Sequence, residues 1–209
     1  RFPAAGASGR NAGFVHLGVG HLYSEAIDIF GHDVARDVWN LTVDNVRRMR
    51  RFAKDFGVEH EEKGAAFVST DEAKSAEMRK SVKLAQRDGF QVEYLDRDPF
   101  ERGFKAAIVH PSDFAIHPAR LTNAMVSSSG ATLYQNDEMA AITRDGVGLV
   151  VRTRQRLVRC GKVLLAVNGY AGRVHPFFRR LVEPARGEVL LTEPAPKVVG
   201  SIGTVLGRF

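Results

Sequence analysis

The residues best suited to binding chemistry lie near the start of the chain, in the glycine-rich segment 6–13. Its three glycines allow the backbone to take positive φ values and to approach a ligand closely. Ser8, Arg10 and Asn11 add donors that suit phosphate or carbonyl oxygens. Glycine, serine and asparagine also dominate surface turns, so the composition of this segment fits a ligand-binding loop and a flexible turn equally well.

A second candidate site follows the apolar run 162–167. A continuous apolar run of this length is typical of a strand that is buried on both faces. The run stops at Asn168, Gly169 and Tyr170. Because α/β proteins bind ligands beyond the carboxyl ends of their strands, this turn is predicted to contribute to a ligand site.

The composition is that of an ordinary globular protein, with 209 residues of which 44% are hydrophobic and 26% charged. The sequence has no apolar run long enough to span a membrane and no signal pattern at its start, which favours a cytoplasmic protein. The single cysteine, Cys160, excludes an internal disulfide and is expected to be buried in a strand. The seven histidines lack metal-ligand spacing, so no metal site is predicted and the histidines are interpreted as structural.

The net charge of +6 permits an anionic partner, either nucleic acid or a phosphate-bearing cofactor. Basic residues gather near the end of a predicted helix over 33–56, namely Arg47, Arg48, Arg50, Arg51 and Lys54. A basic nucleic-acid-binding protein without catalytic activity is therefore an alternative interpretation. The basic residues are not interleaved with aromatic side chains, and no known nucleic-acid-binding motif is present, which argues against it.

The helix over 33–56 is predicted from an Asp33 N-cap, a Gly57 terminator and apolar residues at three- and four-residue spacing. The apolar face is expected to contain Val34, Val38, Leu41, Met49, Phe52 and Phe56. Trp39 is expected in the core rather than at a stacking surface.

The remaining elements alternate and then change to strands. A capping box of Ser69 and Glu72 predicts a helix that ends before Gly89, and His117 followed by Pro118 predicts a capped helix that closes at Gly130. Strands are predicted at 64–69, 92–95 and 106–109, and an antiparallel meander at 132–135, 139–143, 149–153 and 157–159.

Several of these motifs together resemble one known family. The motifs are the segment 5–13, His117–Pro118, the run 163–170, Pro184–Ala185–Arg186–Gly187 and Thr192–Glu193–Pro194. In this order and at these spacings they resemble the FAD-dependent amine oxidoreductases of the D-amino-acid oxidase superfamily. The chain looks most like the branch that contains gamma-glutamylputrescine oxidase and the flavoproteins similar to glycine and sarcosine oxidases.

The resemblance implies an α/β (α+β) fold. It consists of an incomplete FAD-binding Rossmann-like domain with an antiparallel β-meander, plus part of a mixed-sheet substrate domain. The implied FAD-binding portion covers 1–58 and 110–175, and the implied substrate-domain portion covers 59–109 and 176–209.

The resemblance also implies the cofactor and the reaction. FAD would accept a hydride from an amine or amino acid, the imine would hydrolyse, and dioxygen or another acceptor would reoxidise the flavin. The implied FAD-binding residues are Ala7, Ser8, Gly9, Arg10, Asn11, Ala12, Gly13, Met139, Ala166, Asn168 and Gly169. Tyr170 and Arg186 are candidates for the substrate side, although a packed tyrosine and a surface arginine explain them equally well. No catalytic acid or base is identified.

The sequence departs from the family pattern at both ends: the N-terminal glycine turn is missing, and the C-terminal part that completes the substrate domain and returns a glycine-rich contact to the flavin would lie beyond Phe209. The family begins with a strand and a Gly-x-Gly-x-x-Gly turn, whereas Gly18–Val19–Gly20 is not followed by a third glycine at the right position. Without that turn the pyrophosphate would lack a helix N-terminus. The chain is therefore expected to be a fragment that binds FAD weakly or not at all by itself, and an inactive remnant is a further alternative.

Overall fold

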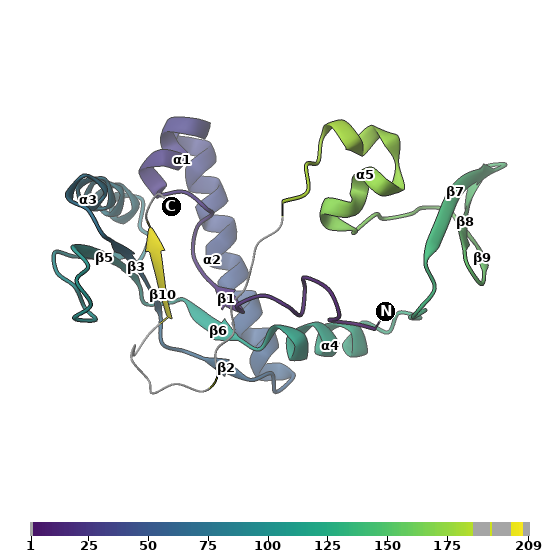
Figure 1. Ribbon diagram of the computed structural model, residues 1–209, viewed down its shortest axis with the longest axis horizontal. Coiled ribbons are helices and arrows are strands. Elements are labelled where there is room, and N and C mark those ends of the chain that lie inside the picture. The colour runs from purple at the N-terminus through teal and green to yellow at the C-terminus, as the bar shows by residue number, and fades with distance from the viewer. Residues whose placement is uncertain (1, 186–192, 194–201, 207–209) are drawn as a thin grey trace.

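The computed structural model describes residues 2–185, 193 and 202–206, the last five by their backbone only. In these residues short strands and five α-helices follow one another along the chain (Figure 1). In chain order the elements are β1 (Phe14–Val15), α1 (Tyr23–Phe30), α2 (His32–Asp55), β2 (His60–Glu61), β3 (Ala65–Ser69), α3 (Glu72–Arg87), β4 (Glu93–Leu95), β5 (Ala106–His110), β6 (Phe114–Ile116), α4 (Pro118–Ser128), β7 (Met139–Asp145), β8 (Gly148–Thr153), β9 (Leu157–Cys160), the 3-10 helix η1 (Asn168–Tyr170), α5 (Ala171–Val174), the 3-10 helix η2 (Pro176–Arg180) and β10 (Ile202–Leu206).

The strands form three sheets. The largest has the order β10-β3-β5-β4, and it is mixed because β10 runs parallel to β3 while the other neighbours are antiparallel. A second sheet has the order β1-β6-β2, and the third is the antiparallel meander β7-β8-β9. Figure 1 shows the meander beyond α4, at the far end of the molecule from the mixed sheet. The mixed α/β fold with an antiparallel meander is confirmed.

The long helix α2 has the predicted length, and its predicted apolar face is confirmed only in part, because Val38 and Met49 are half-buried against the two cores. Its buried residues are Ala35, Trp39, Val46 and Ala53, whereas Leu41 of the predicted apolar face is 69% exposed. Val34 and Phe56, also expected to be buried, are exposed as well. Each residue turns an α-helix by about 100°, so residues next to each other in the sequence lie on different faces. Ala35 and Trp39 pack in the core that contains α1, whereas Val46 and Ala53 pack in a second core with Val15 and Phe114. Small side chains such as alanine allow close approach, which a count of large apolar residues does not detect.

The helix α1 was not predicted. The segment 14–30 reads as apolar and glycine-punctuated, yet residues from Tyr23 onward form a helix that ends at Gly31, whose φ is 83°. Glu25 Oε2 accepts the backbone N–H of Leu22 at 2.8 Å and thereby caps the helix start. A core cluster joins α1, α2, α3 and the mixed sheet through Tyr23, Trp39 and other buried residues. Trp39 is therefore a core residue, as predicted.

The start of α3 differs from the predicted capping box. Asp71, not Ser69, is the N-cap, and its Oδ1 accepts the backbone N–H of Lys74 at 2.7 Å. Ser69 instead completes strand β3, where it is fully buried opposite Ala106. By contrast α4 begins as predicted, because His117 is its N-cap and Pro118 its first residue.

Two predicted strands are absent. Residues 132–135 form an exposed connection between α4 and β7. The apolar run 162–167 is also irregular, and Leu164 within it is 91% exposed. Burial on both faces requires neighbouring strands and covering helices, and among the described residues no strand pairs with this run. Cys160, expected to be buried, is half-buried at the end of β9.

Within the part of the chain that the structure describes, no helix is both long and apolar enough to cross a membrane.

Candidate functional site

The predicted ligand loop is a set of turns held together by Asn11. The side-chain Nδ2 of Asn11 donates to the carbonyl oxygens of Ala7 at 3.0 Å and Ser8 at 3.1 Å. Its Oδ1 accepts the backbone N–H of Gly13 at 2.9 Å. The amide predicted to face a cofactor is thus used to fix the loop. Thr122 Oγ1 of α4 donates to Ser8 O at 3.2 Å, so the loop lies beside that helix (Figure 1).

Two glycines of the loop are required by close backbone contacts. Gly13 has a φ of 73°, and a Cβ atom there would lie 2.1 Å from the carbonyl oxygen of Ile116. The two residues are joined by a hydrogen bond of 2.8 Å from Ile116 N–H to Gly13 O. At Gly9 a Cβ atom would lie 2.2 Å from Ala4 O. Glycine at these two positions therefore allows close contact with the backbone of Ile116 and of Ala4, next to strands β1 and β6.

The loop presents free donors to solvent. Ala7, Ser8, Arg10 and Ala12 are exposed. Arg10 makes no ion pair or side-chain hydrogen bond with any other residue that the structure describes. A guanidinium and a hydroxyl on one rigid loop are the donors that a pyrophosphate needs, so the residues present fit the phosphate end of a dinucleotide cofactor.

The other predicted cofactor residues lie in later segments. Met139 begins β7 and is half-buried next to a bulge, and Ala166 is exposed in the irregular run. Asn168 and Gly169 begin η1, where Asn168 takes a φ of 48°. No hydrogen bond or ion pair between described residues brings any of them to the loop 6–13. The structure thus holds the predicted residues as separate groups.

The two predicted substrate-side residues have different outcomes. Tyr170 is 57% exposed, and the guanidinium of Arg173 lies 5.3 Å from the centre of its ring. Arg186 lies outside the described residues.

A cavity of about 860 Å³ lies between α1, α2, α3 and the strands β3 and β5. The segment that directly follows β1 forms part of its wall, beginning at His16. Its apolar walls include Tyr23, Trp39, Phe67, Val82 and Ile108. Sequence reasoning missed this cavity because its residues come from five separate elements and show no common motif.

Three histidines interpreted from sequence as structural, His16, His21 and His110, line this cavity. Nδ1 of His110 lies 3.1 Å from Oδ2 of Asp113, whose side chain is only 1% exposed. The ring of Phe67 contacts two of these histidines, with its centre 5.9 Å from that of His16 and 4.8 Å from that of His110. Nδ1 of His16 is buried without a hydrogen-bond partner. The described part of the chain contains no group of three or more His, Cys, Asp or Glu residues that could hold a metal ion.

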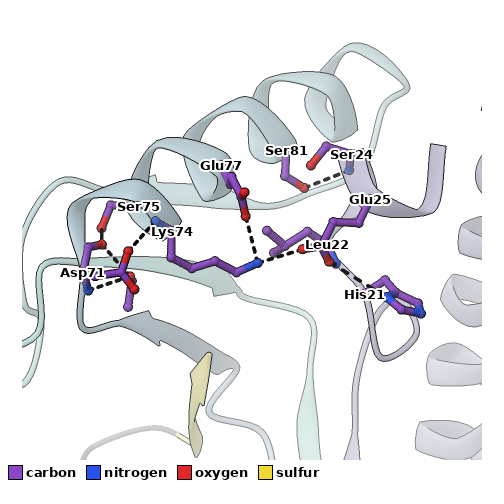
Figure 2. Close-up of polar contacts among 10 residues, drawn as sticks. His21, Leu22, Ser24, Glu25, Asp71, Lys74, Ser75, Glu77 and Ser81 are labelled. Carbon is purple, nitrogen blue, oxygen red and sulfur yellow. Dashed lines mark hydrogen bonds and ion pairs between the residues drawn. The ribbon is translucent and has the colours of Figure 1, made fainter. Parts of the chain in front are cut away.

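The rim of the cavity is charged. Lys74 Nζ lies 2.7 Å from Glu25 Oε1 and 2.9 Å from Glu77 Oε2, as Figure 2 shows. Partial burial would lower the pKa of Lys74, but the hydrogen bonds to the two carboxylates raise it overall. Partial burial would likewise raise the pKa of Glu25, but the bonds from Lys74 and from the Leu22 N–H lower it. Lys74 and Glu25 therefore stay ionised at neutral pH.

Comparisons with known proteins agree with this structure. The model of the family "FAD dependent oxidoreductase" (DAO) matches residues 1–206. A probable oxidoreductase, OrdL, of Rhizobium meliloti is 24% identical over 192 residues, which cover 87% of this chain and 45% of that protein. Glycine oxidase from Geobacillus kaustophilus has a similar fold, with a TM-score of 0.63 and 21% identity over 85% of this chain and 48% of that one. For glycine oxidase from Bacillus cereus the TM-score is 0.59, with 23% identity over 84% and 49% of the two chains.

The fold and the family match define an FAD-linked oxidoreductase class, and the chain belongs to the DAO family of FAD-dependent oxidoreductases. This confirms the family and the cofactor that the sequence motifs imply. The chain spans about half the length of the relatives that it matches.

Proposed function

We propose that the protein oxidises the carbon–nitrogen bond of a small amine or amino acid, with FAD as the cofactor. The family match over residues 1–206 carries this proposal. The exposed Arg10 and Ser8 on the rigid loop support it, because they suit the phosphates of the cofactor. The similar folds include glycine oxidase and an L-proline dehydrogenase, which are named for small amino acids.

The proposed roles follow the chemistry of each group. When bound, FAD supplies the acceptor for a hydride from the substrate carbon that carries the nitrogen. Water then adds to the imine and releases an amine and a carbonyl compound, and dioxygen or another acceptor takes the electrons. In this chain Arg10 and Ser8 bind phosphate, and the walls of Trp39 and Tyr23 exclude water from the cavity.

The remaining assignments are part of the same proposal. Residues 7–13, Met139, Ala166, Asn168 and Gly169 contribute to the FAD site, and Tyr170 and Arg186 to the substrate side. The segments 1–58 and 110–175 form the FAD-binding portion, and 59–109 and 176–209 the substrate-domain portion.

No observation favours the nucleic-acid alternative. Arg50 near the end of α2 is paired with Glu62 at 2.8 Å, and Arg47 with Asp44 at 3.2 Å. The arginines on this helix end therefore do not form a uniformly free cationic surface.

The experiment is an absorption spectrum of the purified full-length protein, followed by titration with FAD and anaerobic addition of glycine, sarcosine, L-proline and small primary amines. We expect a flavin spectrum that one of these compounds bleaches. The change Arg10→Ala should weaken FAD binding by roughly tenfold, because it removes a charge-assisted contact to phosphate. The matched change Arg51→Ala, of an exposed arginine on α2, should leave it unchanged. A protein that takes up no FAD, or whose flavin none of the compounds reduces, would contradict the proposal.

A further inference from the structure

We propose that His110 is the proton acceptor for the substrate, and that its Nε2 atom removes a proton from the substrate ammonium group inside the cavity. This inference rests on the function proposed above. No sequence motif marks His110 as a functional residue; its position in the fold indicates this role.

The hydrogen bond to Asp113 fixes the tautomer of His110. Asp113 is buried, and its Oδ2 lies 3.1 Å from His110 Nδ1, so this nitrogen carries the hydrogen that the carboxylate accepts. The other oxygen, Oδ1, accepts the backbone N–H of Leu17 at 3.0 Å and fixes the orientation of the carboxylate. In neutral His110 the lone pair therefore lies on Nε2. A carboxylate that orients a histidine in this way also stabilises the imidazolium once a proton arrives.

His110 also lies in a cavity whose wall is continuous along the chain with the loop 6–13. His110 lines the cavity, and so does His16, three residues after Gly13 of the loop 6–13. Three extended residues span roughly 10 Å, so Gly13 lies within about that distance of His16. In this proposal the reactive end of a cofactor bound along this loop therefore lies near the cavity. Aromatic side chains in the walls, among them Tyr23, Trp39 and Phe67, suit a cationic ligand.

The charged groups that line the cavity are mostly acidic. Glu25 on α1, together with Asp71 and Glu77 at the start of α3, opposes the single cation Lys74. The titratable side chains that complete the lining are His16, His21 and Tyr23. This excess of carboxylates favours the entry of an ammonium ion over that of a free carboxylate.

The proposed step is a proton transfer without a change of oxidation state. The N–H bond of the substrate ammonium breaks, its electron pair stays on the nitrogen, and the proton forms a bond with His110 Nε2. The products are a neutral amine and an imidazolium paired with Asp113. The lone pair that the amine gains then assists loss of the hydride from the adjacent carbon. A neutral amine is required because an ammonium nitrogen has no electron pair to donate.

The test uses the FAD-loaded protein and measures the rate of anaerobic flavin reduction by stopped flow as a function of pH, with whichever compound of the panel reduces the flavin. His110→Asn should lower the rate near neutral pH by about 100-fold, the lower end of the effect of a general base. At high pH, where solution already supplies neutral amine, the rate should recover. His60→Asn is the matched control, because His60 lies on β2 outside the cavity and contacts the carbonyl of Val58, and its rate should equal that of the unchanged protein.

A second measurement reports the tautomer without any turnover. In ¹⁵N spectra of histidine-labelled protein, the His110 signals are those that the His110→Asn change removes, and they should show hydrogen on Nδ1. In Asp113→Asn the amide can still accept from Leu17, but its NH₂ group faces Nδ1, so the hydrogen should move to Nε2. The reduction rate of Asp113→Asn should fall together with this shift.

The outcomes separate the two proposals. If no compound reduces the flavin of the unchanged protein, the proposed function fails. If the unchanged protein is reduced but His110→Asn has the same pH profile, or if the hydrogen of His110 lies on Nε2, only the assignment of His110 is overturned.

Discussion

The carboxylate of Asp113 and the backbone N–H of Leu17 form a buried hydrogen bond of 3.0 Å between residues 96 positions apart. This bond ties the segment after β1 to the connection between β5 and β6. The same carboxylate bonds to His110, so one buried side chain fixes both the wall of the cavity and a histidine in it.

The change Asp113→Ala should reduce the free energy of unfolding by about 1–3 kcal/mol, because it leaves the buried N–H of Leu17 without an acceptor. Asp113→Asn should cost less, since its amide oxygen can still accept that bond. Urea denaturation measures both. Asp37→Ala, at an exposed position of α2, serves as a control and should change stability by less than about 0.5 kcal/mol. Equal stability of the alanine variant and the unchanged protein would mean that the bond has no structural importance.

Gly13→Ala should destabilise the protein by about 1–3 kcal/mol, because the new Cβ would meet the Ile116 carbonyl at 2.1 Å and the φ of 73° disfavours alanine. The distortion should also weaken FAD binding, since it moves the loop that carries Arg10. Gly6→Ala is the control in the same loop, where a Cβ would meet nothing within 4 Å. Thermal unfolding and FAD titration of both variants test the prediction, which fails if the two behave alike.

Tyr23→Phe should lower stability near neutral pH by about 1 kcal/mol, because it removes the hydrogen bond from the Tyr23 hydroxyl to Asp88. That bond, followed by the bond from His32, holds the pKa of Asp88 below its usual value in the folded protein. Burial, followed by the same bond to Asp88, raises the pKa of Tyr23, so the tyrosine stays a neutral donor.

The sign of the pH dependence follows from Asp88. Because its folded pKa is lowered, its contribution is present above the unfolded pKa and is lost as the pH falls through the lower folded value. The deficit of Tyr23→Phe should therefore shrink in acid, when Asp88 is protonated in both proteins. Denaturation at about pH 7 and about pH 3 measures this change. Tyr94→Phe is a suitable comparison, because its bond of 3.3 Å to Asp96 is exposed. A deficit that is the same at both pH values would argue against the role of Asp88.

Glu25→Gln and Glu25→Ala should separate two roles of one side chain. The glutamine variant loses the ion pair with Lys74, which is partly exposed and should be worth less than about 1 kcal/mol. It can still accept the Leu22 N–H and cap α1. The alanine variant loses both and should be less stable by roughly a further 1 kcal/mol. Denaturation at low and high salt measures these terms, since salt should weaken only the ion-pair part. Identical stabilities of the two variants would show that the cap has no effect.

Local signals in the sequence were sufficient to predict where most of the helices and strands lie. The end of α2 before Gly57, the His117 cap of α4, the strands β3 and β5 and the meander from Met139 onward follow from caps, breakers and short-range periodicity. Asp33 was wrong as the N-cap of α2, because Gly31 holds that position and Asp33 lies in the first turn. These signals act between residues a few positions apart, so they survive in any tertiary context. The motifs that carry the family resemblance are of the same local kind, and the family that they imply is confirmed by the family match.

Burial, by contrast, was decided by tertiary structure. The apolar run 162–167 reads as a buried strand, but a strand exists only where a partner supplies hydrogen bonds, and none does so among the described residues. On α2 the neighbouring helix α1 selects Ala35 and Trp39 for burial and leaves Leu41 exposed. The same holds for the proposed site. His16 and His110 carry no motif in the sequence, and they share a cavity only because β5 ends beside the segment that follows β1. Spacing along the chain records which residues are local neighbours, while the packing of sheet on helix determines which distant side chains meet.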